Sequence, residues 1–210
     1  MKAACRFVAA LVSLLAPCVA QASGGDYAIH GGSAQERGQV RAALEASSFD
    51  WSIVPERIAI TITRGGDSSA SPGRIVLDAN LLDAGRFSWG VVQHEYAHQV
   101  DFFLLDDSKR ALLSAALEAS TWWDAPAALQ HSELGCERFA STLAWAYWPS
   151  IDNTMKPLSP NDEAGALPAP LFRRLLARLL GPPGSTAAMR RAPARPEDSA
   201  PSARIVASTT

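Results

Sequence analysis

Two histidines separated by three residues constrain this chain more than any other feature of its sequence. His94 and His98 stand four positions apart in the stretch Val91–Asp101, and neither proline nor glycine interrupts the segment from His94 onward. On an α-helix they lie one turn apart on the same face, where both imidazoles reach one Zn²⁺ at about 2.0–2.1 Å. Glu95 follows the first histidine, where a carboxylate can take a proton from bound water. The stretch therefore predicts a helical, catalytic zinc site.

The residues around this motif favour a buried helix. An unpartnered carboxylate is costly to bury, so a metal is the expected partner of the two histidines and Glu95. The alternative is a solvent-facing helix with two surface histidines. The stretch resembles the zincin metallopeptidases, whose pattern has uncharged residues at these flanks and an apolar one at the position of Val100. The uncharged residues here are Val91, Val92, Tyr96, Ala97, Gln99 and Val100.

A third metal ligand is expected in the segment His131–Trp148, which has helical periodicity and ends before Pro149. A catalytic zinc has three protein ligands and one open position, so a glutamate here would complete a His₂Glu set. Glu133 and Glu137 both qualify, because residues four apart share one face of a helix. His131 is a further candidate. Residue types and spacing alone leave these alternatives open.

A resemblance favours Glu137 among them. The run Glu137-Arg138-Phe139-Ala140 is similar to the third-ligand helix of gluzincins, where a small residue follows the ligand glutamate by three positions. The pairing of the two motifs is also similar to that in the catalytic domain of anthrax lethal factor. The resemblance covers these two segments and implies His94, His98 and Glu137 as the zinc ligands.

One position departs from the gluzincin pattern. Thermolysin-type enzymes carry an acid four residues past the ligand glutamate, where it orients a histidine, and here that position is Ser141. Asp101 lies three residues past His98 and shares its face of the helix. We therefore consider Asp101 a candidate for the orienting role, with a plain surface acid as the alternative.

Residues 1–22 have the pattern of a secretory signal peptide. Lys2 and Arg6 precede the apolar run Phe7–Ala16, and Ala20-Gln21-Ala22 is a small-x-small cleavage site. The apolar run is too short to span a bilayer core of about 30 Å. We expect export to the periplasm or the medium, cleavage after Ala22, and no membrane anchor after signal removal.

The expected mature chain contains one domain, residues 23–181, followed by a disordered tail, 182–210, rich in Pro, Ala, Ser and Arg. The formal net charge of −2 and the lack of a basic cluster beside aromatic residues argue against nucleic-acid binding. Cys136 is the only cysteine outside the predicted signal peptide, so packing and metal, rather than an internal disulfide, must hold the domain. Nothing in the sequence indicates an oligomeric state.

The patterns predict a small α+β, zincin-like domain, with a short β-sheet beside the metal-binding helix and a mostly helical C-terminal half. Ser33 and Glu36 form a capping box at the start of the first helix. Either predicted strand could form the edge of a cleft along which an extended substrate pairs, or both could lie in the core. The predicted strands are Arg57–Thr63 and Arg74–Asp78, and the predicted helices are Ser33–Ser47, Ser88–Leu105, Ser108–Ser120, His131–Trp148 and a last one starting at Pro170.

The predicted function is zinc-dependent hydrolysis of a peptide bond in a peptide or protein substrate. Glu95 is the expected base, and His131 and Tyr147 are candidates for the additional donor that a tetrahedral intermediate requires. Two other functions stay open at this point. One is a non-catalytic, exported binding module with a metal-stabilised scaffold, and the other is a zinc amide hydrolase acting on cell-wall material.

Overall fold

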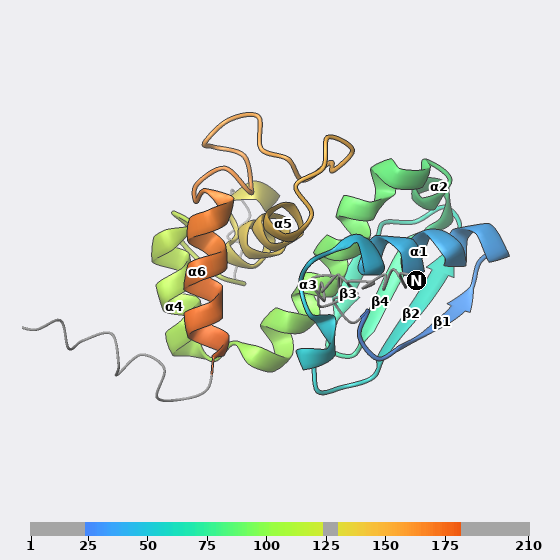
Figure 1. Cartoon of the computed structure of the whole chain (residues 1–210), viewed down its shortest axis with the longest axis horizontal. Coiled ribbons are helices and arrows are strands. Elements are labelled where there is room, and N and C mark those ends of the chain that lie inside the picture. The colour runs from blue at the N-terminus through green and yellow to red at the C-terminus, as the bar shows by residue number, and fades with distance from the viewer. Residues whose placement is uncertain (1–23, 124–129, 182–210) are drawn as a thin grey trace, which may run out of the picture.

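The computed structural model describes residues 24–123 and 130–181 (Figure 1). The predicted signal peptide, its cleavage site and the predicted tail lie outside these residues. Within them, a four-stranded mixed sheet and six α-helices form an α+β domain. The predicted fold class is confirmed: the sheet lies beside the helix that carries His94 and His98, and the C-terminal half is helical.

The sheet has the strand order β1-β2-β4-β3. The first three strands run parallel to one another, and β3 is the antiparallel edge strand. The strands predicted from alternating isoleucines and from the Ile-Val-Leu run are confirmed as β2 and β4. The strand β1 was not predicted, because its short sequence does not alternate clearly. The bounds are Tyr27–Gly31 for β1, Ile58–Thr63 for β2, Ser69–Ser71 for β3 and Arg74–Asp78 for β4.

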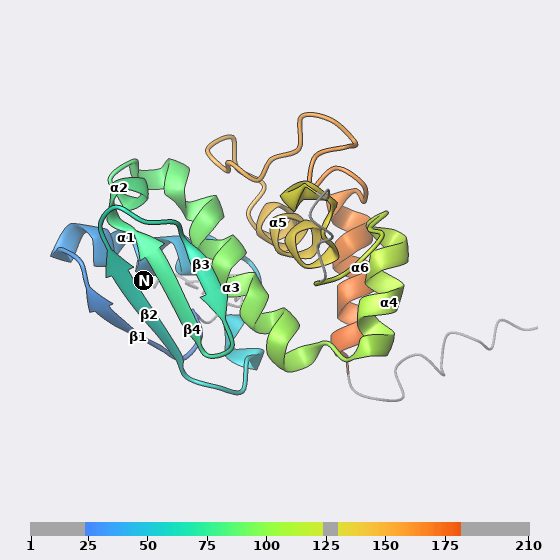
Figure 2. The same ribbon diagram turned by 180° about the vertical axis from the view of Figure 1, so that it is seen from behind.

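Helix α1 (Ala34–Ala46) connects the parallel strands β1 and β2 and covers one face of the sheet (Figures 1 and 2). The predicted capping box is present: the Ser33 amide donates to Glu36 Oε2 at 2.6 Å, and the Glu36 amide donates to Ser33 Oγ at 3.2 Å. These bonds satisfy amides that the first helical turn leaves unpaired. The helix therefore begins where the sequence predicted.

Helix α3 (Trp89–Leu104) runs between the sheet and the helical half of the molecule (Figures 1 and 2). Every residue from Val92 to Asp101 is buried. A helix buried on all sides needs partners for its polar groups. Gln99 has them, because its side-chain amide donates to the Ser71 carbonyl at 3.0 Å and accepts from the Gly73 amide at 2.8 Å. These bonds fasten the β3–β4 hairpin to α3.

Of the two roles considered for the predicted strands, edge of a cleft or part of the core, the structure has the second. Both β2 and β4 have a neighbour on each side, so neither offers a free edge to a substrate. The edge is β3, for which the sequence predicted no strand. Its three residues are too few to show periodicity, and contacts with β4 and Gln99 hold it instead.

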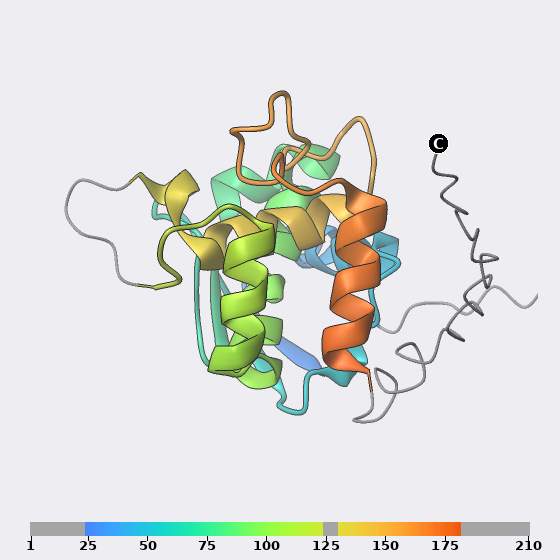
Figure 3. The same cartoon turned by 90° about the vertical axis from the view of Figure 1, so that its left-hand side faces the viewer.

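The C-terminal half consists of three longer helices, with α4 and α6 flanking α5 (Figure 3). Helix α4 ends four residues earlier than predicted. Leu112 of α4 and Leu171 of α6 are 58% and 43% exposed, although the other leucines of these helices lie in the core or pack against it. The helix predicted for 131–148 is broken at Leu134, which separates the 3₁₀ turn η3 from α5. The bounds are Asp107–Ala116 for α4, His131–Glu133 for η3, Gly135–Tyr147 for α5 and Ala169–Leu180 for α6.

Three short elements complete the described chain: η1 (Trp51–Ile53), α2 (Ala79–Leu82) and η2 (Gly85–Ser88). Among the helices of the described ranges, none combines the length and the apolar character that crossing a bilayer requires.

Candidate metal centre

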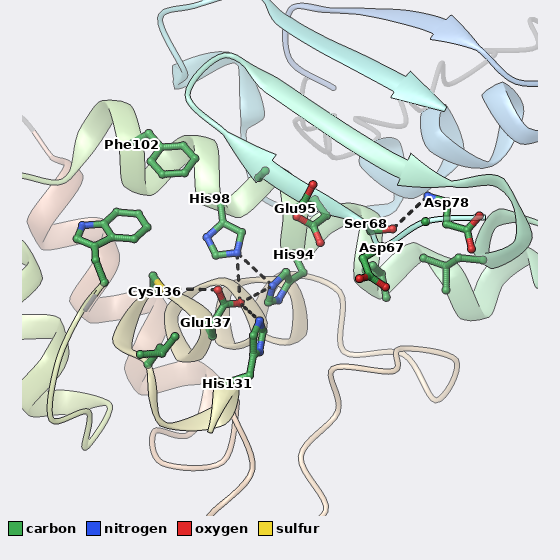
Figure 4. A pocket seen from close by; sticks show the side chains of 17 residues that line it. Asp67, Ser68, Asp78, His94, Glu95, His98, Phe102, His131, Cys136 and Glu137 are labelled. Atoms are coloured by element: carbon green, nitrogen blue, oxygen red, sulfur yellow. Dashed lines mark hydrogen bonds and ion pairs between the residues drawn. The ribbon is translucent and has the colours of Figure 1, made fainter. Parts of the chain in front are cut away.

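Three side-chain atoms from α3 and α5 converge where the two helices face each other (Figure 4). His94 Nε2 lies 3.2 Å from His98 Nε2 and 3.1 Å from Glu137 Oε2. His98 Nε2 lies 3.4 Å from the same carboxylate oxygen. The two histidines are buried and Glu137 is nearly so. Together these residues could hold a metal ion.

The separations between these atoms fit a tetrahedral ion. With ligand distances of about 2.0–2.1 Å, two ligand atoms of a tetrahedral site lie about 3.3 Å apart. The three observed separations are 3.1, 3.2 and 3.4 Å. Two imidazole nitrogens and a carboxylate oxygen present lone pairs to one another at this range, so a proton or a cation has to lie among them. The donor set, two nitrogens and one oxygen, suits a divalent metal.

The charges of the ligand residues depend on one another. Burial raises the pKa of Glu137, but hydrogen bonds from His94 and His98 outweigh it and hold that pKa well below its usual range. Burial lowers the pKa of His98, and the hydrogen bond with Glu137 reverses the shift, so that the pKa is raised. Glu137 is thereby kept ionised and attracts positive charge. A bound cation would take the place of the protons, as metal binding to histidine generally does.

Glu95 lies on the sheet side of the centre, next to His94 and His98 (Figure 4). It is 6% exposed and lines the cleft above the three ligand atoms. Burial raises the pKa of its carboxyl group above the usual range, and the neighbouring imidazoles only partly oppose that shift. A carboxylate with a raised pKa is a stronger base, which suits it to accept a proton from water.

The centre opens into a cleft of about 610 Å³. One wall is formed by residues 66–70, which include the start of the edge strand β3, and the opposite wall by η3 and the beginning of α5. At one end, the rings of Phe102 and Trp123 stack with centroids 5.3 Å apart. Trp123 is 42% exposed, whereas its neighbour Trp122 is buried. Trp123 therefore lines the cleft, whereas Trp122 packs in the core.

Glu133, the alternative third ligand, lies outside the converging group. Its carboxylate accepts a hydrogen bond from the Gln130 amide at 2.7 Å and caps η3. The break at Leu134 is the physical reason, because Glu133 and Glu137 no longer lie on one helix and do not share a face. His131 does reach the centre. Its Nε2 lies 3.2 Å from Glu137 Oε2, and its side chain is 67% exposed at the mouth of the cleft.

Two other expected site residues are elsewhere. Asp101 does not bond to a ligand histidine, because its carboxylate accepts hydrogen bonds from Arg110 Nε at 2.9 Å and Trp122 Nε1 at 2.8 Å. Tyr147 is ten residues past Glu137 on α5, about 15 Å along the helix axis. Its ring packs against Phe49 with centroids 5.0 Å apart, in a different pocket. Neither candidate therefore lies where its considered role at the site requires, and Asp101 is not the surface acid of the alternative either.

The hydrogen-bond partners of His94 Nδ1 and of the group behind it are two residues that the sequence did not single out as orienting groups. Ser141 Oγ lies 2.9 Å from His94 Nδ1, and Glu163 Oε2 lies 2.5 Å from Ser141 Oγ. The departure at Ser141 was visible in the sequence. Glu163 gave no signal, because it lies 26 residues past Glu137 in a segment without periodicity.

Cys136 lies beside this centre and is buried. Its Sγ lies 3.6 Å from Glu137 Oε1.

Comparisons of the chain with models of protein families, with curated proteins and with solved structures give no match.

Proposed function

We propose that this protein is an exported, zinc-dependent metallopeptidase with His94, His98 and Glu137 as its metal ligands. The observation that carries the proposal is the set of separations among the three ligand atoms, 3.1–3.4 Å, which matches a tetrahedral ion with zinc-like bond lengths. Two imidazoles and a carboxylate are a common ligand set of catalytic zinc. The resemblance of the two motifs to gluzincins supports the same assignment.

A catalytic rather than a structural metal is favoured by the surroundings of the ligands. Structural zinc is enclosed by four protein ligands, whereas catalytic zinc keeps one position open. Among the described residues, three side chains form the converging group, and a cleft of about 610 Å³ reaches it. That volume falls within the usual range of ligand sites, about 300–1,000 Å³. The scaffold-only alternative gives no account of this cleft.

In the proposed reaction, two residues of the chain have separate roles beside the metal: Glu95 transfers protons and His131 stabilises negative charge. Zinc at this site would polarise the substrate carbonyl and lower the pKa of water. Glu95, with its raised pKa, accepts the proton of the attacking water and passes it to the leaving amine. His131, at the mouth of the cleft, would donate to the oxygen on which negative charge develops.

A peptide substrate is favoured by the edge strand. The strand β3 is paired with β4 on one side only, and Ser69 and Ala70 line the cleft. A free strand edge offers backbone N–H and C=O groups to an extended chain, which binds by adding a strand to the sheet. This feature favours a peptide over a cell-wall amide that lacks an extended backbone.

The proposal is tested on the metal-depleted protein reconstituted with zinc. We expect about one zinc per chain and hydrolysis of casein. Glu95→Gln should retain zinc and lose turnover, because it removes only the proton acceptor. A chain that binds no zinc at neutral pH would end the proposal. Hydrolysis of peptidoglycan fragments but not of casein would favour the alternative function, a zinc amide hydrolase acting on cell-wall material. N-terminal sequencing of the exported protein checks the proposed cleavage after Ala22.

A further inference from the structure

The connection between α5 and α6, residues 149–168, brings a carboxylate to the metal centre. Glu163 Oε1 lies 3.1 Å from His131 Nδ1, and Glu163 Oε2 lies 2.5 Å from Ser141 Oγ. Ser141 Oγ lies in turn 2.9 Å from His94 Nδ1. One acid is thereby linked to two histidines of the site, directly to one and through a hydroxyl group to the other.

The direction of these hydrogen bonds follows from the position of His94. Its Nε2 faces Glu137 and His98, so a metal among them takes the Nε2 lone pair and the proton stays on Nδ1. The Nδ1–H group then donates to Ser141 Oγ. Ser141 donates its own proton to Glu163, because an ionised carboxylate only accepts. The arrangement selects the tautomer of His94 that binds metal.

The other ligand histidine has no such support in the described part of the chain. His98 Nδ1 is buried and has no hydrogen-bond partner there. Its ring stacks on Phe102, with centroids 6.2 Å apart, so packing alone sets its orientation. The Ser141–Glu163 link is therefore specific to His94.

The connection that carries Glu163 is fastened to the body of the protein. The Asn153 side chain donates to two backbone carbonyls near the C-terminal end of α5, at 3.1 and 2.8 Å. Arg138 Nη2 donates to the Asn161 carbonyl at 3.2 Å. Ala164, directly after Glu163, is 3% exposed. The carboxylate is thus held in place before a metal binds, and little ordering remains to be done.

We propose that Glu163 is a positioning residue of the metal centre, which orients His94 through Ser141 and holds His131 at the mouth of the cleft. The inference rests on the proposed function, because it requires a metal at His94. A carboxylate behind a ligand imidazole fixes the ring and raises its basicity, and losing it typically costs about 10–100-fold in metal affinity. Here that acid comes from a distant connection rather than from the helix of the third ligand.

Zinc affinity, measured by competition with a chelator on the full chain, tests the link to His94. We expect Glu163→Ala and Ser141→Ala each to weaken zinc binding about 10–100-fold. Glu163→Gln should lose less, since its amide oxygen still accepts one hydrogen bond. The double variant should bind no more weakly than the weaker single variant, because both substitutions break the same link. The visible spectrum of bound Co²⁺ should change in the same variants.

The neighbouring acid provides a matched control. Asp162 accepts hydrogen bonds from the amides of Leu158 and Ser159, at 2.6 and 2.9 Å, and caps only its own loop. Asp162→Ala should therefore leave zinc affinity and the Co²⁺ spectrum as in the wild type. Equal weakening by Asp162→Ala and Glu163→Ala would show a general effect of loosening the loop, and would overturn the positioning role.

Further outcomes separate this inference from the proposed function. If the wild type binds zinc and His94→Ala does not, while Glu163→Ala binds as tightly as the wild type, only the positioning role is overturned. If zinc affinity in the Ser141→Ala, Glu163→Ala double variant falls by the product of the two single losses, the two residues do not act through one shared link. A wild type that binds neither zinc nor cobalt overturns both proposals. The role of Glu163 toward His131 is tested separately, because Glu163 contacts His131 and Ser141 does not. Glu163→Ala should therefore lower kcat on casein more than Ser141→Ala does. Equal losses of kcat would overturn the proposed holding of His131.

Discussion

Asp101 and Arg110 form an ion pair in which the carboxylate is completely buried. Arg110 Nε lies 2.9 Å from Asp101 Oδ1, and the side chain of Asp101 is 0% exposed. Trp122 Nε1 donates to the other carboxylate oxygen at 2.8 Å. The pair joins the C-terminal end of α3 to α4 and to the segment after it. The acid considered as a candidate for orienting a histidine of the site thus serves the packing of the helical half.

Arg110→Met should destabilise the protein by about 3–5 kcal/mol, because it leaves a buried carboxylate without its cation. Chemical denaturation of the zinc-free protein measures this loss. Arg110 also contacts the fully exposed Asp107 at 3.5 Å, and Asp107→Asn should change stability little. A small effect of Arg110→Met at neutral pH would show that water or another group replaces the arginine.

The destabilisation caused by Arg110→Met should depend on pH, because Asp101 is a titratable group. Burial raises the pKa of Asp101 even with Arg110 and Trp122 bound to it. A carboxyl group whose folded-state pKa exceeds its unfolded one favours the folded state below the unfolded pKa, and this contribution is lost as pH rises through the folded pKa. Removing Arg110 raises the folded pKa further. The deficit of Arg110→Met should therefore be largest at neutral pH and shrink in acid.

Glu137→Ala and Glu133→Ala distinguish the two candidate ligands. Glu137→Ala leaves two histidines as possible ligands. Zinc affinity should therefore fall by more than about 100-fold, the upper end of the loss caused by removing a residue that only supports a ligand. Glu133 only caps η3, so Glu133→Ala should bind zinc like the wild type. Zinc content after dialysis against a weak chelator compares the two. Loss of zinc from Glu133→Ala alone would place the third ligand one turn earlier.

The two motifs could be found from the sequence because each is local. His94 and His98 share a helix, and the burial of α3 follows from its uncharged residues. The break at Leu134 that separates Glu133 from Glu137 has no proline or glycine at its centre, although Gly135 follows it. The Gly135 amide is instead held by the Thr121 carbonyl at 2.8 Å, a contact between distant segments that local patterns do not contain.

The edge strand and Glu163 could not be predicted for a related reason. The position of β3 depends on Gln99 of α3, which binds the Ser71 carbonyl from 28 residues away. Glu163 contacts Ser141, 22 residues earlier. Neither β3 nor Glu163 lies in a segment with clear periodicity or at a known motif spacing. Asp101 shows the converse, because it has the right spacing from His98 and yet pairs with Arg110.

His131→Ala should retain zinc and lose turnover. His131 Nε2 lies 3.2 Å from Glu137 Oε2, but His131 does not belong to the group of converging ligand atoms. Removing one donor to a developing oxyanion typically lowers kcat about 10²–10³-fold. Casein hydrolysis and zinc content, measured on the same preparation, provide the two readouts. Loss of zinc would instead make His131 a fourth ligand and favour a structural metal.

Replacing glycine with alanine should change the stability of the protein in opposite directions at two helical positions, Gly38 and Gly90. Gly38 lies within α1, where a Cβ would meet no atom within 4 Å. Gly90 lies in the first turn of α3, where a Cβ would overlap Asn153 Oδ1. Asn153 has little freedom to move, because it donates to two carbonyls of the α5 end and accepts from the Met155 amide at 2.9 Å.

Gly38→Ala should therefore stabilise the protein by about 0.5–1 kcal/mol, the gain from replacing glycine inside a helix. Gly90→Ala should destabilise it by about 1–3 kcal/mol, because overpacking outweighs that gain. Thermal unfolding of the zinc-free variants measures both. Because Asn153 belongs to the connection that carries Glu163, Gly90→Ala should also weaken zinc binding, whereas Gly38→Ala should not. Unchanged zinc affinity in a destabilised Gly90→Ala variant would show that the connection holds Glu163 in place without its contact to α3.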